Sequence, residues 1–423
     1  MTADAVGGVW QYAIQLAGDL VRTGWSLVVS TLRRPPPPSP HAPAKAPCLG
    51  LLDTRLPLDW LAADAQAVTI AADAIAALAA ARAVDVVQLN QPALAIADYA
   101  MPVVAVVHSC VASWWEAVEH GPLPADLAWQ TELVARGLAH ADAIVCPTRA
   151  FAATIQRLYA LPVAPLAIHN GRTLPAATGA LDARAFTAGR LWDRGKNIAT
   201  LDRAAALLPL PFRAAGPARG PHGEHHQFHH LEPLGRISDA AIAAALSTRP
   251  IFASAALYEP FGLAVLEAAL AGCALVLSDI PTFRELWDGV ATFVAADDAE
   301  AFARAIADLA ADTDLRVARG ALARARALDY APEQTAHAMA ALLDRVTERA
   351  ERLAVTQAIC QLNGVDRRVL SLLWHLAERW GRVAGDGIVI PLALPHRIIA
   401  SLVGARRPTV STAVARLSEQ GAV

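Results

Sequence analysis

Lysine is nearly absent from this chain of 423 residues. Lys45 and Lys196 are the only two, so arginine supplies the rest of the 36 basic side chains. Arginine binds anions as a planar fork and lysine as a compact point charge, so a chain that otherwise uses arginine needs a local reason to keep a lysine. We find no such reason for Lys45, which lies in a proline-rich stretch. Lys196 is therefore a candidate for a specific charge contact.

Cysteine and uninterrupted apolar segments are also scarce. The cysteines never form a C-x-x-C pair, which argues against a disulfide framework and favours reduced thiols in a cytoplasmic protein. The longest apolar run, residues 261–277, carries Glu267, and a carboxylate at the centre of a bilayer is costly. We therefore expect a buried helix and strand there, and we find no signal-peptide pattern at the start. The five cysteines are Cys48, Cys110, Cys146, Cys273 and Cys360.

Charged residues make up only 18% of the chain, against 55% hydrophobic residues, which excludes a disordered protein and predicts a packed one. The length predicts two or three domains. The net charge of -3 is unevenly distributed, because residues 340–423 hold 11 arginines against 7 acidic residues, a formal charge of +4. A basic tail on an acidic body indicates different partners for the two parts.

Short apolar runs alternate with helical stretches over the first 335 residues. Continuous apolar runs of this kind are typical of parallel strands covered on both faces. We therefore predict an α/β protein with two Rossmann-like lobes, residues 1–165 and 166–335, and a cleft between them. The expected strands are 26–31, 84–89, 103–107, 143–146, 186–188, 250–253 and 274–277, and the expected helices of the second lobe are 198–207, 239–246, 262–271 and 299–311.

The first helix follows Gly7-Gly8, and its period predicts that Trp10, Ile14, Ala17 and Val21 share one apolar face. Residues 33–47 are so rich in proline that they cannot pair in a sheet, and we expect a stiff exposed loop. The pattern changes near residue 350, where a continuous helix at 333–362 leads into a mainly helical third unit, residues 340–423. That unit holds a helix at 367–380 and a short strand at 388–390.

Two glycines and a basic pair predict an anion site. Gly8 lacks a Cβ and begins a helix, so backbone can approach an anion there, although a plain tight turn has the same pattern. In AGRLWDRGKN, residues 188–197, Arg190 ends a strand and Lys196 precedes a helix. Both can reach one pyrophosphate, and the alternative is a solvated loop.

Two glutamates and a histidine complete the candidate site. Glu259 and Glu267 have seven residues between them in YEPFGLAVLE, and Pro260 suits a first helical turn, which would place Glu259 at a helix entrance. Sugar hydroxyls would satisfy both carboxylates, and the alternative is a capping residue plus a structural ion pair. His108 follows the run VVAVV, at the end of a parallel strand where ligands bind. A structural histidine is the alternative there.

Five histidines gather in HGEHHQFHH, residues 222–230. Imidazole suits zinc or nickel, but we see no second group of ligands at a defined spacing. We therefore predict a polar surface loop and no metal site.

These motifs resemble glycosyltransferase family 4, retaining enzymes of the GT-B fold. The resemblance covers residues 1 to about 335 and includes DAVGGVWQYAIQLAGDL, VVHS, IHNGR at 168–172 and SDIPTFRELWDG. It implies a nucleotide-diphosphate sugar as donor, with no separate cofactor or metal. The acceptor is an unidentified glycan, lipid or small molecule.

The resemblance also implies a role for each candidate residue. Arg190 and Lys196 would hold the pyrophosphate, with Gly8 close to the phosphates. Glu267 would bind the ribose, Glu259 the transferred sugar, and His108 would lie near the reacting carbon. Family members have a full strand before the GGV loop, whereas only residues 1–3 stand there here, so we expect an exposed edge or a lost inner pairing. Donor binding should close the cleft, because its ligands come from both lobes.

The stretch from 395 to 421 predicts a helix-turn-helix. Ile398, Ile399, Leu402 and Val403 would face inward, Gly404 would permit the turn, and Val410, Val414 and Leu417 would face inward from the second helix. An ordinary helical hairpin is the alternative. The exposed start of the second helix, where base edges and phosphates are met, would carry Arg406, Arg407, Thr409, Ser411 and Thr412.

This unit resembles the DNA-binding domain of Crp/Fnr-type regulators. The resemblance implies that Arg407 contacts bases and that the helix at 340–362 supports a homodimer. The chain ends at Val423, where the wing of that winged-helix-like unit would begin, so we expect the phosphate contacts of the wing to be missing. The sequence therefore predicts a glycosyltransferase, with a DNA-binding regulator whose transferase lobes are inert or sensing as the alternative.

Overall fold

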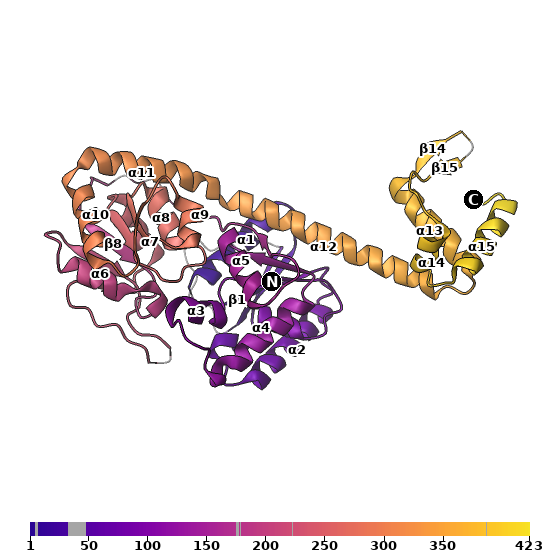
Figure 1. The fold of residues 1–423 in the computed structure, drawn as a ribbon, viewed down its shortest axis with the longest axis horizontal. Coiled ribbons are helices and arrows are strands. Elements are labelled where there is room, and N and C mark those ends of the chain that lie inside the picture. Colours follow the sequence, from indigo (N-terminus) through magenta and orange to yellow (C-terminus); the bar gives the residue numbers. More distant parts are fainter. Residues whose placement is uncertain (5–6, 33–47, 175–176, 178, 222, 386) are drawn as a thin grey trace. The chain divides into compact units, whose positions relative to one another are not determined.

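The computed structural model describes residues 1–4, 7–32, 48–174, 177, 179–221, 223–385 and 387–423. The chain divides into two compact units, Met1–Leu343 and Asp344–Val423, and the boundary falls inside the long helix α12 (Pro332–Gln361) (Figure 1). The predicted proline-rich loop at 33–47 lies outside the described residues. Within the described part of the chain, no helix combines the length and apolarity needed to cross a membrane.

The N-terminal lobe holds two parallel sheets where one was predicted. A three-stranded sheet has the order β1-β2-β3, and a four-stranded sheet has the order β4-β5-β6-β7. The last strand, at Leu166–Ala167, extends this lobe past the predicted boundary at 165. The strands are β1 (Thr2–Asp4), β2 (Leu27–Leu32), β3 (Leu49–Asp53), β4 (Val87–Leu89), β5 (Val103–Val106), β6 (Ala143–Cys146) and β7 (Leu166–Ala167).

Side chains connect these two sheets. The hydroxyl of Thr2 donates to Gln91 Oε1 (3.0 Å) and accepts from the backbone N–H of Asn90 (2.9 Å), while the Asn90 amide donates to the Thr2 carbonyl. The three residues of β1 pair with β2, as the sequence predicts for the end of a strand, but form no described ladder with β4. Buried polar side chains therefore connect β1 to the residues that follow β4, where no backbone ladder is described.

Helices of the N-terminal lobe pack around these sheets. Of the four residues predicted to share one apolar face of α1, Ala17 is buried, whereas Trp10, Ile14 and Val21 are partly exposed. The buried face carries Tyr12 and Leu16 instead, because the remaining face of the helix borders a cavity. The helices are α1 (Gly8–Arg22), η1 (Asp59–Leu61), α2 (Ala65–Ala81), η2 (Pro92–Ile96), α3 (Val111–Val118), η3 (Ala125–Leu127), α4 (Ala128–His140) and α5 (Arg149–Leu158).

The C-terminal lobe has one continuous parallel sheet of six strands, in the order β10-β9-β8-β11-β12-β13. Successive residues alternate between two buried cores, so that Phe252 packs on one face and Ile251 on the other. This two-sided burial explains the continuous apolar runs in the sequence. The strands are β8 (Ala185–Ala188), β9 (Phe212–Ala215), β10 (Glu232–Gly235), β11 (Ile251–Ser254), β12 (Leu275–Ser278) and β13 (Thr292–Val294).

Helices flank both faces of this sheet, and the start of α8 differs from the prediction. Gly262 precedes α8 with φ of +92°, a left-handed conformation that glycine adopts easily, so Pro260 lies outside the helix and Glu259 lies in the preceding loop. The helices are η4 (Arg194–Lys196), α6 (Ile198–Ala205), α7 (Asp239–Ser247), α8 (Leu263–Ala271), α9 (Pro281–Trp287), α10 (Ala299–Ala311), α11 (Thr313–Ala327) and η5 (Leu328–Tyr330).

The Asp344–Val423 unit is a small helical domain with its own core. Its predicted inward residues Ile399, Val403, Val410 and Leu417 are buried, Leu402 and Val414 pack partly buried against the same core, and Ile398 is exposed. The strand expected at 388–390 belongs to an antiparallel hairpin. The elements are α13 (Val365–Trp380), β14 (Arg382–Ala384), β15 (Gly387–Val389), α14 (His396–Leu402) and α15 (Arg407–Glu419).

Candidate active site

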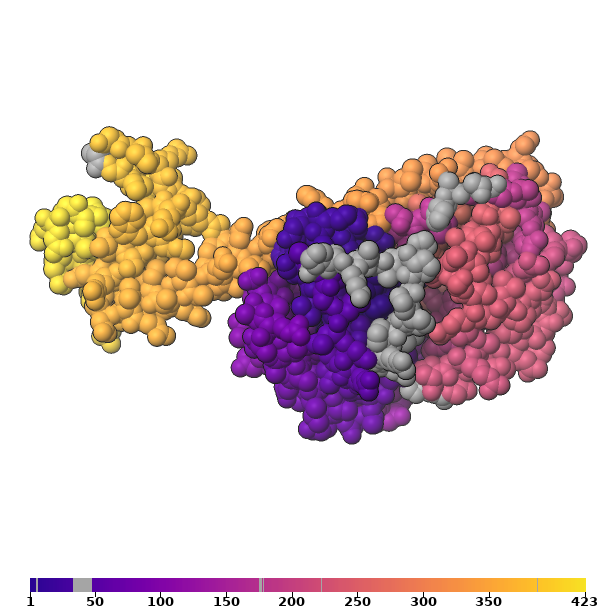
Figure 2. All heavy atoms as spheres, turned by 180° about the vertical axis from the view of Figure 1, so that it is seen from behind, coloured from indigo at the N-terminus to yellow at the C-terminus, as the bar shows by residue number. Residues whose placement is uncertain are grey.

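A cavity of about 1730 Å³ lies in the Met1–Leu343 unit, and residues of both lobes line it. Figure 2 shows the two lobes, the first in indigo to purple and the second in pink. Every residue that the sequence places in the donor site lines this one cavity, although the motifs are spread over 260 positions of the chain. These residues are Gly8, His108, Arg190, Lys196, Glu259 and Glu267.

Lys196 and Glu259 form an ion pair within the cavity. The Lys196 ammonium group donates to Glu259 Oε2, and each side chain is only 17% exposed. Lys196 ends the short helix η4, and Asn197 then adopts a left-handed conformation with φ of +51° that redirects the chain into α6. The two side chains therefore lie close enough to contact one ligand.

Asp193, which the sequence analysis missed, holds Arg190. The Arg190 guanidinium donates two hydrogen bonds to Asp193 Oδ2, of 3.2 and 2.8 Å. The other oxygen accepts from Trp114 Nε1 (3.0 Å) and from the Gly195 backbone (2.9 Å). Burial acts to raise the pKa of Asp193, but the Arg190 charge and these hydrogen bonds outweigh it, and the pKa is lowered. A carboxylate thus fixes the arginine in place, and an indole of the other lobe contacts the same carboxylate.

Glu267 pairs with Arg172, a second residue that the sequence analysis did not single out. Arg172 Nε donates to Glu267 Oε1 (2.7 Å), and Glu267 is buried in α8. Burial raises the pKa of this carboxyl, and the arginine opposes the shift. The structural ion pair that the sequence offered as the alternative for Glu267 is therefore present, and both of its residues also line the cavity. Arg172 belongs to the IHNGR motif, which was the available signal.

His108 lies at the end of β5 against Asn90 and Tyr12. Its Nε2 is 3.0 Å from Asn90 Oδ1, and its ring meets Tyr12 edge-on with a centroid distance of 4.6 Å. Because the Asn90 amide nitrogen donates to the Thr2 carbonyl, the oxygen faces the histidine, and Nε2 must carry the proton. Burial lowers the pKa of His108 to about 4, so the ring is neutral at neutral pH.

The N-terminus of α1 opens on the cavity. Gly7 is the N-cap with φ of +75°, and no side chain caps the helix. A Cβ added to Gly8 would lie 3.2 Å from Leu263 Cδ1 of the other lobe, so only a small residue fits this approach. The first backbone N–H groups of α1, which have no partner within the helix itself, therefore lie on the side of the cavity that holds the basic residues.

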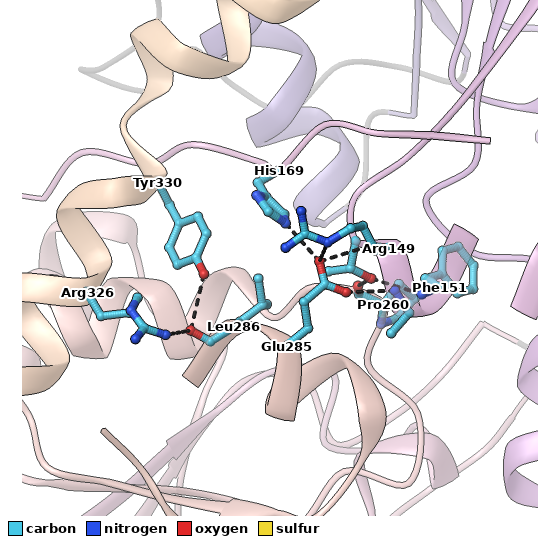
Figure 3. Close-up of polar contacts among 10 residues, drawn as sticks. Arg149, Phe151, His169, Pro260, Glu285, Leu286, Arg326 and Tyr330 are labelled. Carbon is cyan, nitrogen blue, oxygen red and sulfur yellow. Dashed lines mark hydrogen bonds and ion pairs between the residues drawn. The ribbon is translucent and has the colours of Figure 1, made fainter. Parts of the chain in front are cut away.

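Glu285, a further residue absent from the predicted site, links the two lobes (Figure 3). From α9 of the C-terminal lobe, its carboxylate accepts from the backbone N–H groups of Arg149 (2.9 Å) and Ala150 (2.7 Å), which begin α5 of the N-terminal lobe. His169 Nε2 lies 3.0 Å from the same carboxylate. Burial acts to raise the pKa of Glu285, but the hydrogen bonds from His169 and the backbone outweigh it and lower the pKa.

The histidine-rich segment does not form a metal centre among the described residues, where no three metal-ligating side chains gather. His222 lies outside the described residues. The backbone N–H groups of His229 and His230 donate to Asp202, which secures the end of the segment. His226 packs edge-on against Phe228 with a centroid distance of 4.9 Å.

The predicted DNA-binding residues gather at the start of α15. Arg406, Arg407, Thr409 and Thr412 are exposed. Ser411 is partly buried, and its hydroxyl donates to the Arg407 carbonyl (3.1 Å) and accepts from His396 Nδ1 (2.9 Å). This hydroxyl already joins α14 to α15, which leaves it less available to a ligand than the other four side chains.

Comparison with protein families identifies three regions of the chain. Residues 6–173 match Glycosyltransferase Family 4, residues 183–312 match Glycosyl transferases group 1, and residues 367–423 match the Crp-like helix-turn-helix domain. One curated relative is a phosphatidyl-myo-inositol mannosyltransferase of Mycolicibacterium smegmatis, 39% identical over 99 residues. That match spans 23% of this chain and 25% of the relative, so it covers only a quarter of the relative's length.

Solved structures show the same fold at low sequence identity. Sucrose-phosphate synthase from Thermosynechococcus elongatus has a TM-score of 0.68 and 19% identity, over 82% of this chain and 95% of that one. Anabaena HepE in complex with UDP-glucose has a TM-score of 0.61 and 17% identity, over 82% and 100%. WaaG, a glycosyltransferase of lipopolysaccharide biosynthesis, has a TM-score of 0.60 and 15% identity, over 79% and 98%. The chain therefore combines a Glycosyltransferase Family 4 domain and a Glycosyl transferases group 1 domain, in a GT-B fold, with a Crp-like helix-turn-helix domain.

Proposed function

We propose that the Met1–Leu343 unit transfers a hexosyl group from a nucleotide-diphosphate sugar to an acceptor hydroxyl, with retention of the anomeric configuration. The observation that supports this is the convergence of two basic and two acidic side chains on one cavity. Arg190 and Lys196 bring positive charge for a diphosphate, and Glu259 and Glu267 bring acceptors for hydroxyl groups.

Each residue then has a distinct part. Arg190, positioned by Asp193, and Lys196 bind the diphosphate, and the uncapped start of α1 at Gly8 adds backbone N–H groups. Glu267, positioned by Arg172, accepts from the ribose, and Glu259 accepts from the transferred sugar. The neutral His108 donates through Nε2 to Asn90, so its Nδ1 is left as a hydrogen-bond acceptor for the donor sugar near the reacting carbon. No separate cofactor or metal takes part.

Donor release provides the test. Purified chain is incubated with UDP-, GDP- and ADP-sugars, and free nucleoside diphosphate is measured, beginning with UDP-glucose because a protein of the same fold binds it. Lys196→Ala and Glu267→Ala should each abolish release, since they remove a phosphate contact and a ribose contact. The exposed Arg304→Ala is the control and should keep parental release. No release with any donor, or unchanged release in Lys196→Ala, would contradict the proposal.

Domain closure belongs to the same proposal, because the side chains assigned to the donor come from both lobes. Small-angle scattering of the chain should show a smaller radius of gyration when the donor is added. An unchanged profile at saturating nucleotide would count against closure while leaving donor release as a separate result.

A second activity, binding of duplex DNA, is supported by the Crp-like domain and by four exposed side chains at the start of α15. In this alternative the transferase lobes are inert or act as a sensor, and α12 supports a homodimer. Electrophoretic mobility shifts should show binding that weakens with salt and is lost in Arg407→Ala, with Arg379→Ala as a control outside the helix-turn-helix. DNA binding without any donor release would favour the regulator over the enzyme.

A further inference from the structure

The two walls of the cavity differ in charge. All the arginines and the lysine that line it in the described part of the chain come from the C-terminal lobe. On the N-terminal wall, the described lining residues include no arginine or lysine, and the charged groups are Asp4 and Asp59. The basic wall is the one assigned to the donor diphosphate, which leaves the N-terminal wall for the acceptor. The basic lining residues are Arg172, Arg190, Arg194, Lys196, Arg219 and Arg236.

Tryptophan is concentrated on the N-terminal wall. Of the ten tryptophans in the chain, Trp10, Trp60, Trp114, Trp115 and Trp129 line that wall, and they come from four separate elements, α1, η1, α3 and α4. All five are partly exposed. Trp60, Trp114 and Trp129 pack one side against the core of the lobe, and each of the five also borders the cavity. Half of the tryptophans of the protein therefore contribute to one solvent-accessible surface.

Three of these indole N–H groups are bonded within the protein. Trp114 Nε1 donates to Asp193 (3.0 Å), Trp115 Nε1 to the Gly121 carbonyl (3.0 Å) and Trp60 Nε1 to Asp4 (3.4 Å). What these rings offer to a ligand is consequently flat carbon surface. The face of an aromatic ring carries partial negative charge, so it attracts C–H groups and cations and disfavours phosphates and carboxylates.

Neutral polar side chains lie between the tryptophans. Gln11, Gln15, Gln130 and Thr131 line the same wall, together with His108 at its deep end. Amides and hydroxyls are matched to ligand hydroxyl groups. Gln15 already donates to Asp19 (3.2 Å) and Gln11 to Asp239 (3.4 Å), whereas the buried Thr131 hydroxyl has no partner among the described residues. Flat apolar surface beside neutral hydrogen-bonding groups fits a sugar ring, which has C–H faces and hydroxyl edges.

We propose that the acceptor is an uncharged saccharide or glycoside whose ring lies on these tryptophans, rather than a sugar phosphate or a phospholipid. This rests on the proposed transferase function. In the transfer, the bond between the donor anomeric carbon and the diphosphate oxygen breaks, and its electron pair stays on that oxygen. The acceptor hydroxyl oxygen forms the new bond to the anomeric carbon, and the hydroxyl proton passes to the released diphosphate. The products are a longer neutral saccharide and a nucleoside diphosphate.

Saturation-transfer difference NMR on the full chain tests the acceptor class directly. The probes are the common neutral hexoses, their methyl glycosides and the disaccharides sucrose, maltose and cellobiose. Each hexose is matched with its 6-phosphate, and vesicles of phosphatidylinositol form a third arm. UDP is present throughout. Neutral sugars should show saturation of ring C–H protons, and the matched 6-phosphates should show at least about fivefold less.

Variants of Trp129 locate the contact. Trp129→Ala should reduce the neutral-sugar signal by about fivefold or more, Trp129→Phe should restore most of it, and Trp374→Ala, in the other unit, should leave it unchanged. A stronger signal from the 6-phosphates or the vesicles would overturn the proposal. So would a panel in which no neutral sugar exceeds the Trp129→Ala background.

Donor release in the same preparations keeps this test separate from that of the transferase itself. If nucleoside diphosphate is released and neutral sugars fail to bind, only the acceptor inference is wrong. If no donor is turned over at all, the proposed transferase function fails, whatever the sugars do. Lys196→Ala should lose donor release while it keeps the neutral-sugar signal, because Lys196 lies on the opposite wall.

Discussion

The two lobes of the Met1–Leu343 unit build their sheets in different ways. In the C-terminal lobe six strands share one backbone ladder, whereas in the N-terminal lobe seven strands form two described sheets joined by the side chains of Thr2, Asn90 and Gln91. A backbone ladder tolerates most changes of side chain, because its hydrogen bonds belong to every residue. A side-chain bridge depends on the particular residues that form it.

The same contrast extends to the cavity. The C-terminal lobe contributes charged side chains that are paired with one another, and the N-terminal lobe contributes tryptophans and the neutral His108. His108 depends on Asn90, and Asn90 depends on Thr2 in the short first strand. The position of one candidate residue thus depends on the bridge between the two N-terminal sheets, whereas the C-terminal candidates depend on local ion pairs.

The largest effect is expected from Asp193→Ala in the C-terminal wall. The buried carboxylate accepts from Arg190, Trp114 and Gly195, so its loss leaves a charge and two N–H groups without their partner. We expect the free energy of unfolding to fall by about 3 kcal/mol, mainly because the N–H groups of Trp114 and Gly195 lose their acceptor while the half-exposed Arg190 can be solvated, and we expect donor release to be lost. Urea unfolding followed by circular dichroism measures the change. Asp308→Ala, at an exposed site in α10, is the control. An equal loss of unfolding free energy in both variants would show that the hydrogen bonds to Asp193 do not stabilise the fold.

Whether a strand or helix could be predicted from the sequence depends on how local its sequence signal is. The strand Ala143–Cys146 and the helix Ala299–Ala311 have the predicted bounds, because a continuous apolar run and a strong helical period mark each of them. By contrast, β10 was not predicted. Its sequence, EPLG, is exposed at every residue and includes a proline, so only its neighbour β9 makes it a strand.

For the candidate site, too, only residues with a local sequence signal could be predicted. Residues with a motif of their own, such as Lys196 and Glu267, could be chosen from the sequence. Their partners could not, because Asp193, Arg172 and Asn90 are selected by contacts that form only when distant segments meet. The apolar face of α1 has the same limit: an apolar residue such as Trp10 can border a cavity as well as a core, and periodicity alone does not separate the two.

Thr2→Val tests the bridge between the N-terminal sheets. The variant keeps the shape of Thr2 but leaves the buried Asn90 N–H and Gln91 Oε1 unpaired, so we expect a loss of about 2–3 kcal/mol of unfolding free energy. Hydrogen exchange should accelerate in β1 and β4 and remain at the parental rate in β8 and β11. Thr2→Ser retains the hydroxyl and should lose much less. Uniform acceleration in both lobes would mean that the bridge is not specific to the N-terminal sheets.

His108, in the N-terminal lobe, predicts a fall in stability at acid pH. Its pKa is about 4 in the folded protein, against an ordinary value of 6.5, so the unfolded chain binds more protons below pH 6.5. Stability should therefore fall as the pH drops from 6.5 toward 4, by about 2 kcal/mol between pH 7 and pH 5. His108→Gln should remove this part of the slope in urea unfolding across that range. His337→Gln, at an exposed position in α12, should keep the parental slope, and a parental slope in His108→Gln would contradict the assignment.

Glu285→Gln tests the contact that joins the lobes, and we expect the smallest effect. The carboxylate caps the start of α5 from the other lobe and contacts His169, while the amide keeps one acceptor oxygen and loses the charge. We expect a loss of about 1 kcal/mol in urea unfolding, because a charged acceptor at a helix N-terminus becomes a neutral one. Glu300→Gln, in the exposed first turn of α10, is the matched control and should lose only about 0.3 kcal/mol of unfolding free energy.

The contact of Glu285 crosses the boundary between the lobes, so its loss should also raise hydrogen exchange at Arg149 and Ala150 without affecting β11. Unchanged exchange at these two amides would show that α5 is held by Thr148 alone, which caps Phe151 and donates to the Pro260 carbonyl of the other lobe.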